Sequence, residues 1–181
     1  MIDLRKTALP DTITVKGRAF RIYTDYRVWL DFGVKFKEPG CSLRDLLFVF
    51  VDEVPYCNFL PELIEFYSNP NSTPKSINGD SDDCTILVDY IEDGEYIYAS
   101  FLKDYGIDLI DTDMHWWKFK ALFNSLSEDT KIKTIMGYRA YKKPPKNYNM
   151  NTEHEKLKKA WSLEPEFTEE EMNALEEFNN L

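Results

Sequence analysis

The chain has 181 residues, 43% of them hydrophobic and 15% aromatic, which is enough apolar surface for one sizeable core and excludes disorder throughout the chain. Thirty-two acidic residues against 22 basic ones give a formal net charge of -10, and this charge excludes a general affinity for nucleic acid or anionic lipid. We therefore expect neither nucleic-acid nor membrane partners.

A β-hairpin is predicted near the start of the chain. Ile13, Val15, Phe20 and Ile22 alternate with other residues around the pair Lys16-Gly17. This alternation places all four apolar side chains on one face of a two-stranded ribbon, and the glycine allows a tight turn.

Three helices are predicted between residues 24 and 67, from apolar side chains at three- and four-residue spacing. Thr24 can cap the first, and Ser42 with Asp45 can form a capping box for the second. Pro61 is compatible with a helix in the first turn of the third. The apolar positions are Trp29, Phe32 and Phe36, then Leu43, Leu46, Leu47 and Phe50, then Leu60, Leu63, Ile64 and Tyr67.

Residues 69–84 are rich in Pro, Asn, Ser and Asp without periodicity, which predicts a solvated loop. A long aromatic helix should follow and end at Gly106 in a left-handed cap. Its apolar stripe is Tyr98, Phe101, Leu102 and Tyr105.

Three more helices are predicted in the rest of the chain before the last acidic stretch. Thr112 or Asp113 can cap a helix whose stripe is Trp116, Phe119, Phe123 and Leu126. Ser127, Glu128 and Asp129 predict the start of another helix, because they offer a cap and two negative charges. A short charged helix is predicted around residues 153–161.

The predicted fold class is mainly α, a helical bundle with a short N-terminal β-hairpin. We expect residues 1–160 to form a single mainly helical domain, with a loop at 69–84. Residues 161–181 should form an acidic C-terminal extension with an amphipathic helix, because a capping box precedes apolar side chains at helical spacing.

Seven residues are candidates for contacts with a partner protein, because exposed aromatic, Arg and apolar side chains dominate protein interfaces. For Trp116 a core position is favoured, since its large side chain stabilises the fold when it is covered. For Tyr138 and Arg139 the slightly favoured interpretation is a core tyrosine and a surface arginine that compensates the helix end. The candidates are Trp116, Trp117, Tyr138, Arg139, Met172, Leu175 and Phe178.

No catalytic, cofactor-binding or metal-ligating motif is found. His115 and His154 have no ligand at a spacing that recurs in metal sites, and phosphate-binding glycine loops are absent from the sequence. An enzyme built around His115 with Asp111 or Asp113 is a weaker hypothesis, because helix capping explains both aspartates. We expect no cofactor.

The residues resemble a known family at several places. The runs "DGEYIYASFLKDYGIDL", "MHWWKFKALFNSL" and "IMGYR", with the opening "DTITVKGRAFRIYTDYRVWLDF", resemble the phage gene-product-fifteen family in order and spacing. That family occurs in tail operons of long-tailed phages of Gram-positive bacteria. Residues 69–84 and the chain after about residue 160 are not part of the resemblance.

The resemblance implies a non-enzymatic tail assembly protein in the host bacterial cytoplasm. The family's genes usually lie between those for the tail tube and the tape-measure protein, a place where related phages encode assembly chaperones. The implied partner is the tape-measure protein or another phage tail protein, with a homo-oligomer as a further possibility. The competing hypothesis is an acidic phage regulator or DNA mimic that binds a host defence enzyme, which net charge alone suggests.

Overall fold

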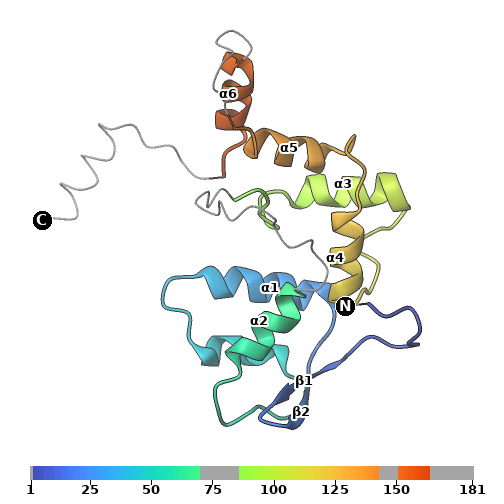
Figure 1. The fold of residues 1–181 in the computed structure, drawn as a ribbon, viewed down its shortest axis with the longest axis vertical. Helices are drawn as coiled ribbons and strands as arrows, with labels where there is room; N and C mark the ends of the chain where they lie inside the picture. Colours follow the sequence, from blue (N-terminus) through green and yellow to red (C-terminus); the bar gives the residue numbers. More distant parts are fainter. Residues whose placement is uncertain (1, 70–85, 143–150, 164–181) are drawn as a thin grey trace, which may run out of the picture. The chain divides into compact units, whose positions relative to one another are not determined.

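The computed structural model describes residues 2–69, 86–142 and 151–163 of the chain. The described part is mainly α-helical, with one two-stranded antiparallel sheet near the N-terminus (Figure 1). The predicted fold class is confirmed. In chain order the elements are β1 Thr12–Val15, β2 Arg18–Arg21, α1 Tyr26–Lys37, the 3-10 helix η1 Leu43–Val49, α2 Leu60–Ser68, α3 Gly94–Tyr105, α4 Trp116–Asn124, α5 Lys131–Arg139 and α6 Asn151–Ala160.

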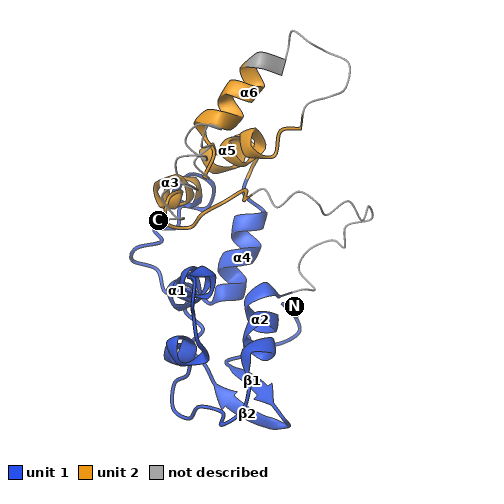
Figure 2. Cartoon of the chain, turned by 90° about the vertical axis from the view of Figure 1, so that its left-hand side faces the viewer, with its two compact units in different colours: residues 1–79, 101–126 blue, residues 80–100, 127–181 orange. Residues whose placement is uncertain are grey.

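Two compact units divide the chain, and each is interrupted in sequence (Figure 2). Unit 1 comprises residues 1–79 and 101–126, and unit 2 comprises residues 80–100 and 127–181. The division therefore falls inside α3 and again between α4 and α5. The expectation of one domain over residues 1–160 stays a prediction. The predicted loop at 69–84 and the amphipathic helix of 161–181 lie outside the described residues, apart from their first positions.

The hairpin of unit 1 has the register that the alternation predicts, with Val15 opposite Arg18. Lys16 and Gly17 both have positive φ angles, 48° and 81°. A two-residue hairpin turn whose twist matches that of the strands requires positive φ at both central residues. All four predicted apolar side chains are buried, each no more than 7% exposed. β1 packs against α2, which covers this face.

The core of unit 1 lies between α1, η1, α2 and α4. Trp29 and Phe32 of α1 are fully buried, and the Trp29 ring contacts the Phe66 ring of α2 with centroids 4.6 Å apart. Phe119 of α4 stacks on Tyr26 of α1 at 4.8 Å. The predicted stripe of α4 is buried at all four positions, Trp116, Phe119, Phe123 and Leu126.

Three predicted helix starts are wrong by a few residues. Asp25 caps α1 by accepting a hydrogen bond from the backbone N–H of Arg27, in place of Thr24. His115 caps α4, in place of Thr112 or Asp113. Residues 127–130 form a turn before α5, since the Thr130 N–H donates to the Ser127 carbonyl at 3.0 Å, and α5 begins at Lys131.

Two predicted helices differ from expectation in type or face. Residues 43–49 are a 3-10 helix, in which only Leu46 and Val49 are buried, although the Asp45 carboxylate accepts from the Ser42 N–H as a capping box requires. In α3 the buried face passes through Ile97 and Phe101, whereas Leu102 is 46% exposed. Gly106 ends α3 with a φ of 62°, as predicted.

Unit 2 contains α5, α6 and the first part of α3. Ile132 and Ile135 of α5 are fully buried, and α5 packs against α6. The Trp161 ring, just beyond α6, contacts the Tyr96 ring edge-on at 5.7 Å and lies under the Lys131 ammonium. The predicted short helix before Trp161 is confirmed.

Candidate functional site

The tandem tryptophan of α4 caps the end of another helix. The Trp116 indole N–H donates to the carbonyl of Tyr67 and the Trp117 indole N–H to the carbonyl of Phe66, both at 2.9 Å. These carbonyls belong to the last turn of α2, where backbone oxygens have no partner within the helix. Both indoles therefore satisfy groups that a helix end leaves unpaired.

Lys120 completes this cap with a positive charge. Its ammonium donates to the carbonyls of Tyr67 at 3.0 Å and Ser68 at 2.7 Å. A cation is favourable at the negative end of a helix dipole, and the ammonium also lies 5.6 Å from the centre of the Trp116 ring. Burial lowers the pKa of the Lys120 ammonium and raises the pKa of the Tyr67 hydroxyl.

His115 connects the start of α4 to the N-terminal segment. Its Nδ1 accepts from the Trp117 backbone N–H at 3.0 Å, and its Nε2 lies 3.0 Å from the Pro10 carbonyl. Since a carbonyl can only accept, Nε2 carries the proton and the imidazole is neutral. Burial lowers the pKa of His115, which favours the same form.

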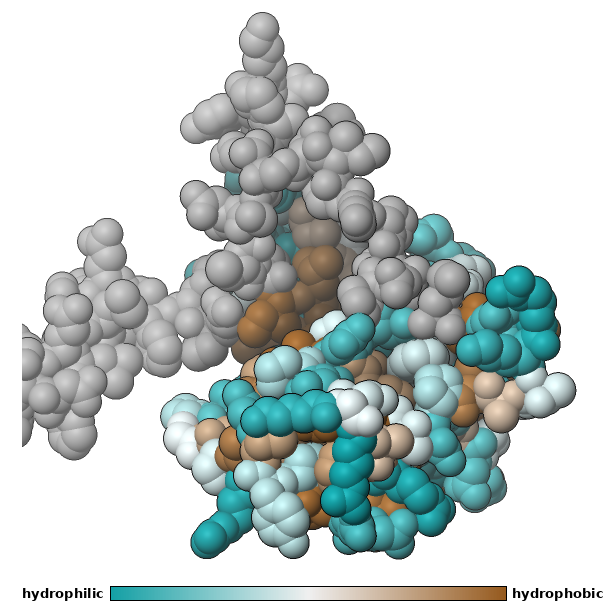
Figure 3. Space-filling view, turned by 60° about the horizontal axis from the view of Figure 1, so that its bottom comes forward, coloured by the Kyte–Doolittle hydropathy of each residue, from teal (hydrophilic) through white to brown (hydrophobic). Residues whose placement is uncertain are grey.

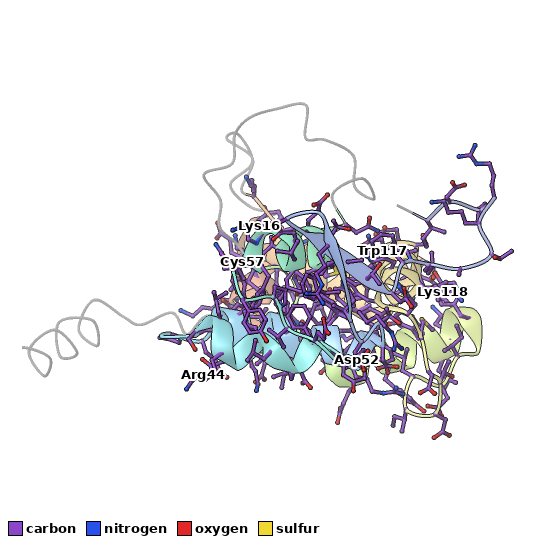
Figure 4. The ribbon with its side chains drawn as sticks, turned by 90° about the horizontal axis from the view of Figure 1, so that it is seen from below. Lys16, Arg44, Asp52, Cys57, Trp117 and Lys118 are labelled. Atoms are coloured by element: carbon purple, nitrogen blue, oxygen red, sulfur yellow. The ribbon has the colours of Figure 1, made fainter. Side chains whose placement is uncertain are left out.

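His115 and Lys118 also line a pocket of about 390 Å³ whose other wall is residues 2–9. Figure 4 shows Lys118 beside Trp117, apart from Arg44 of η1. The pocket mixes apolar side chains with Asp3, Lys6 and Lys118. Asp3 is paired with Arg5 at 2.9 Å.

Arg139 is buried in unit 2, not on its surface. Its guanidinium donates to both carboxylate oxygens of Asp93, at 2.6 and 2.9 Å, and the two side chains are 5% and 2% exposed. Two further bonds reach the carbonyls of Leu87 at 3.0 Å and Trp161 at 2.6 Å. One side chain thus holds α5, the turn before α3 and the residue after α6 together.

The sequence candidates are therefore placed in two different units. Trp116 is 1% exposed and Trp117 is partly buried in unit 1, while Arg139 is 4% exposed and Tyr138 is partly buried in unit 2. The core interpretation is correct for Trp116, and the surface interpretation of Arg139 is wrong. Whether these residues contact a partner stays a prediction. Met172, Leu175 and Phe178 lie outside the described residues.

Large apolar side chains are nevertheless exposed at other positions. Figure 3 shows apolar patches scattered among hydrophilic residues on one face of the molecule. In the described part of unit 1 the exposed positions are Leu4, Tyr23, Phe36, Leu43, Tyr56, Leu102 and Ile110, and in unit 2 they are Ile86 and Ile91.

The loop that joins α3 to α4 is hydrogen-bonded to side chains of α1. The Arg27 guanidinium donates to the carbonyls of Leu109, Ile110 and Thr112 at 2.9 to 3.1 Å, and the Tyr26 hydroxyl donates to Leu109 at 2.5 Å. The sequence pattern did not single out Arg27, because three backbone acceptors more than 80 residues away leave no local signal.

Among the described residues, no group of three or more His, Cys, Asp and Glu side chains is arranged to hold a metal ion. In the same part of the chain, no helix has both the length and the apolar character needed to cross a bilayer.

Comparison with known proteins gives one match. The model of a family described as "Bacteriophage Gp15 protein" matches residues 57–163, which is more than half of the chain. The matched range begins after the hairpin and α1. It includes the donors that cap α2, the loop before α4, and the buried pair of Arg139 with Asp93. Searches of curated proteins and of solved structures gave no match.

Proposed function

Because the chain belongs to the Bacteriophage Gp15 protein family, we propose that it is a non-enzymatic assembly protein of the phage tail that binds the tape-measure protein as a chaperone. Family membership is the observation that carries this proposal. It makes the chain a bacteriophage protein and supports a structural or assembly role. The tail operon, the partner and the host bacterial cytoplasm as its place of action are parts of the proposal.

The surface of the chain supports binding to apolar polypeptide. Ile110 and Tyr56 are each at least 74% exposed, and covering such side chains is the main favourable term in protein association. Hydrogen bonds from Arg27 hold the loop that carries Ile110 against α1. In this proposal the chain covers helix-forming apolar segments of the tape-measure protein before the tail tube closes around them.

Co-expression tests the proposal directly. The tape-measure protein from the same phage should be more soluble with the chain than without it, and the two should co-purify. The tail tube protein serves as the matched control, because it comes from the same particle and should not be retained. An unchanged soluble yield of the tape-measure protein, without co-purification, contradicts the chaperone function.

A further inference from the structure

The loop between α3 and α4 is built as a preformed surface. Arg27 and Tyr26 supply four hydrogen bonds to carbonyls of residues 109, 110 and 112. The Ile110 N–H also donates to the Asp108 carboxylate at 2.9 Å. The backbone on both sides of Ile110 is thus fixed before any partner arrives, which lowers the entropy lost on binding.

The side chain at the tip of this loop is apolar and exposed. Leu109 is 6% exposed and anchors the loop in unit 1, whereas Ile110 next to it is 74% exposed. Nothing in the described part of unit 1 covers Ile110. A rigid loop that presents an isoleucine to solvent has the form of an interface anchor.

The charge around this tip is negative. Residues 104–113 contain four aspartates and no lysine or arginine, and Lys103 just precedes them. Arg27 forms ion pairs with Asp113 at 3.3 Å and with Asp25 at 3.1 Å, so its charge is already balanced. Asp111 at the tip is exposed. A complementary partner is therefore apolar at its centre and basic at its edge.

We propose that this loop, with Ile110 at its centre and Asp111 at its edge, docks a basic amphipathic helix of the tape-measure protein. The inference rests on the proposed chaperone function and names the class of segment recognised. A helix with leucines on one stripe and lysines beside it covers Ile110 and places a lysine ammonium near the Asp111 carboxylate.

Fluorescence anisotropy with two synthetic helices tests the charge preference. One labelled peptide carries leucine on one face and lysine on the other, and its twin has every lysine replaced by glutamate. The full chain should bind the lysine peptide at least about tenfold more tightly. Added salt should weaken this binding, because surface charges are screened. Equal affinity for the two peptides overturns the inference.

Matched variants of the chain test the site. Ile110→Ser and Asp111→Asn should each weaken lysine-peptide binding several-fold, while Ile91→Ser, which removes an isoleucine 65% exposed in unit 2, should leave it unchanged. Wild-type binding by Ile110→Ser, or equal losses in Ile110→Ser and Ile91→Ser, contradicts this location.

Co-purification with the intact tape-measure protein separates the two proposals. If Ile110→Ser retains the tape-measure protein as well as wild type does, the chaperone function stands and the loop is not its site. If the wild-type chain binds the lysine peptide but never the tape-measure protein, the loop is a docking surface and the chaperone function is wrong.

Discussion

Arg139 forms a buried ion pair with Asp93 that connects segments of unit 2. The guanidinium has four hydrogen bonds to Asp93, Leu87 and Trp161. Removing one partner of such a pair leaves the other charge buried without compensation. Replacing Arg139 alone should therefore lower the free energy of unfolding by a large amount. The intact ion pair itself contributes little more to this free energy than apolar side chains of the same size.

Arg139→Met should destabilise the chain by about 3–5 kcal/mol, because the Asp93 carboxyl group is left buried without its partner. Urea unfolding followed by circular dichroism measures the loss. The double variant Asp93→Leu with Arg139→Met removes both charges and should recover part of it. Arg5→Ala, which breaks an exposed pair with Asp3, is the control and should have little effect. A single variant as stable as wild type contradicts the buried pair.

His115 makes stability depend on pH. Its folded pKa is lowered from the ordinary value of 6.5, first by burial, so the unfolded chain binds a proton more readily. The stabilising contribution is complete above pH 6.5 and declines as the pH falls through this value towards the lower folded pKa. His115→Asn, which can still accept from the Trp117 N–H, should flatten this dependence. Measuring the free energy of unfolding of wild type and His115→Asn between about pH 8 and pH 5 tests this prediction. The same slope of free energy against pH in the two proteins contradicts it.

Residues of this kind show the limit of reading single positions from the sequence. Asp93 lies 46 residues before Arg139, and no local pattern connects them. His115 gives no capping signal in the sequence, because histidine is not among the side chains that usually cap helices. The Arg139 pair and the hydrogen bond from His115 to the Pro10 carbonyl are tertiary contacts that only the folded chain brings together.

At the scale of the elements, α2 depends on α4 for its last turn. Two indoles and one ammonium occupy the carbonyls of residues 66 to 68. Asn69 ends the helix in the left-handed conformation with a φ of 44°, and its N–H donates to the Glu65 carbonyl at 3.0 Å, whereas the donors to residues 66 to 68 come from α4. A short helix of nine residues gains much of its stability from such tertiary contacts.

Trp117→Phe should cost about 1 kcal/mol, because the ring is kept and one hydrogen bond to the Phe66 carbonyl is lost. Thermal unfolding measures this change. Trp117→Ala should cost clearly more, since it also removes the contact between the Trp117 and Phe66 rings. Equal stabilities of the two variants are the result that would refute a separate role for the indole N–H.

The elements themselves could be predicted well where two signals agree. In the hairpin, alternation and the Lys16-Gly17 turn both indicate the observed register. For α3, Gly106 marks the end correctly, yet the predicted apolar stripe differs from the buried face, because aromatic side chains occur on several sides of the helix. Helix starts are predicted less well, because several nearby residues can cap: Asp25 follows Thr24, Asp113 follows Thr112, and Thr130 lies three residues after Ser127.

At the scale of the molecule, net charge sets the expected partners. With a formal charge of -10, the chain should not retard double-stranded DNA in a gel-shift assay at low salt, because its field repels phosphate. The same DNA with a basic DNA-binding protein is the positive control. Retardation that disappears as salt rises would show a phosphate-binding surface and contradict this expectation.

The distribution of indoles provides a ready optical probe. Of the four tryptophans, Trp29, Trp116 and Trp117 belong to unit 1 and Trp161 belongs to unit 2. Replacing Trp161 by phenylalanine leaves emission from unit 1 alone, and the difference from wild type reports on unit 2. Intrinsic fluorescence can therefore follow the melting of each half of the chain without any attached dye.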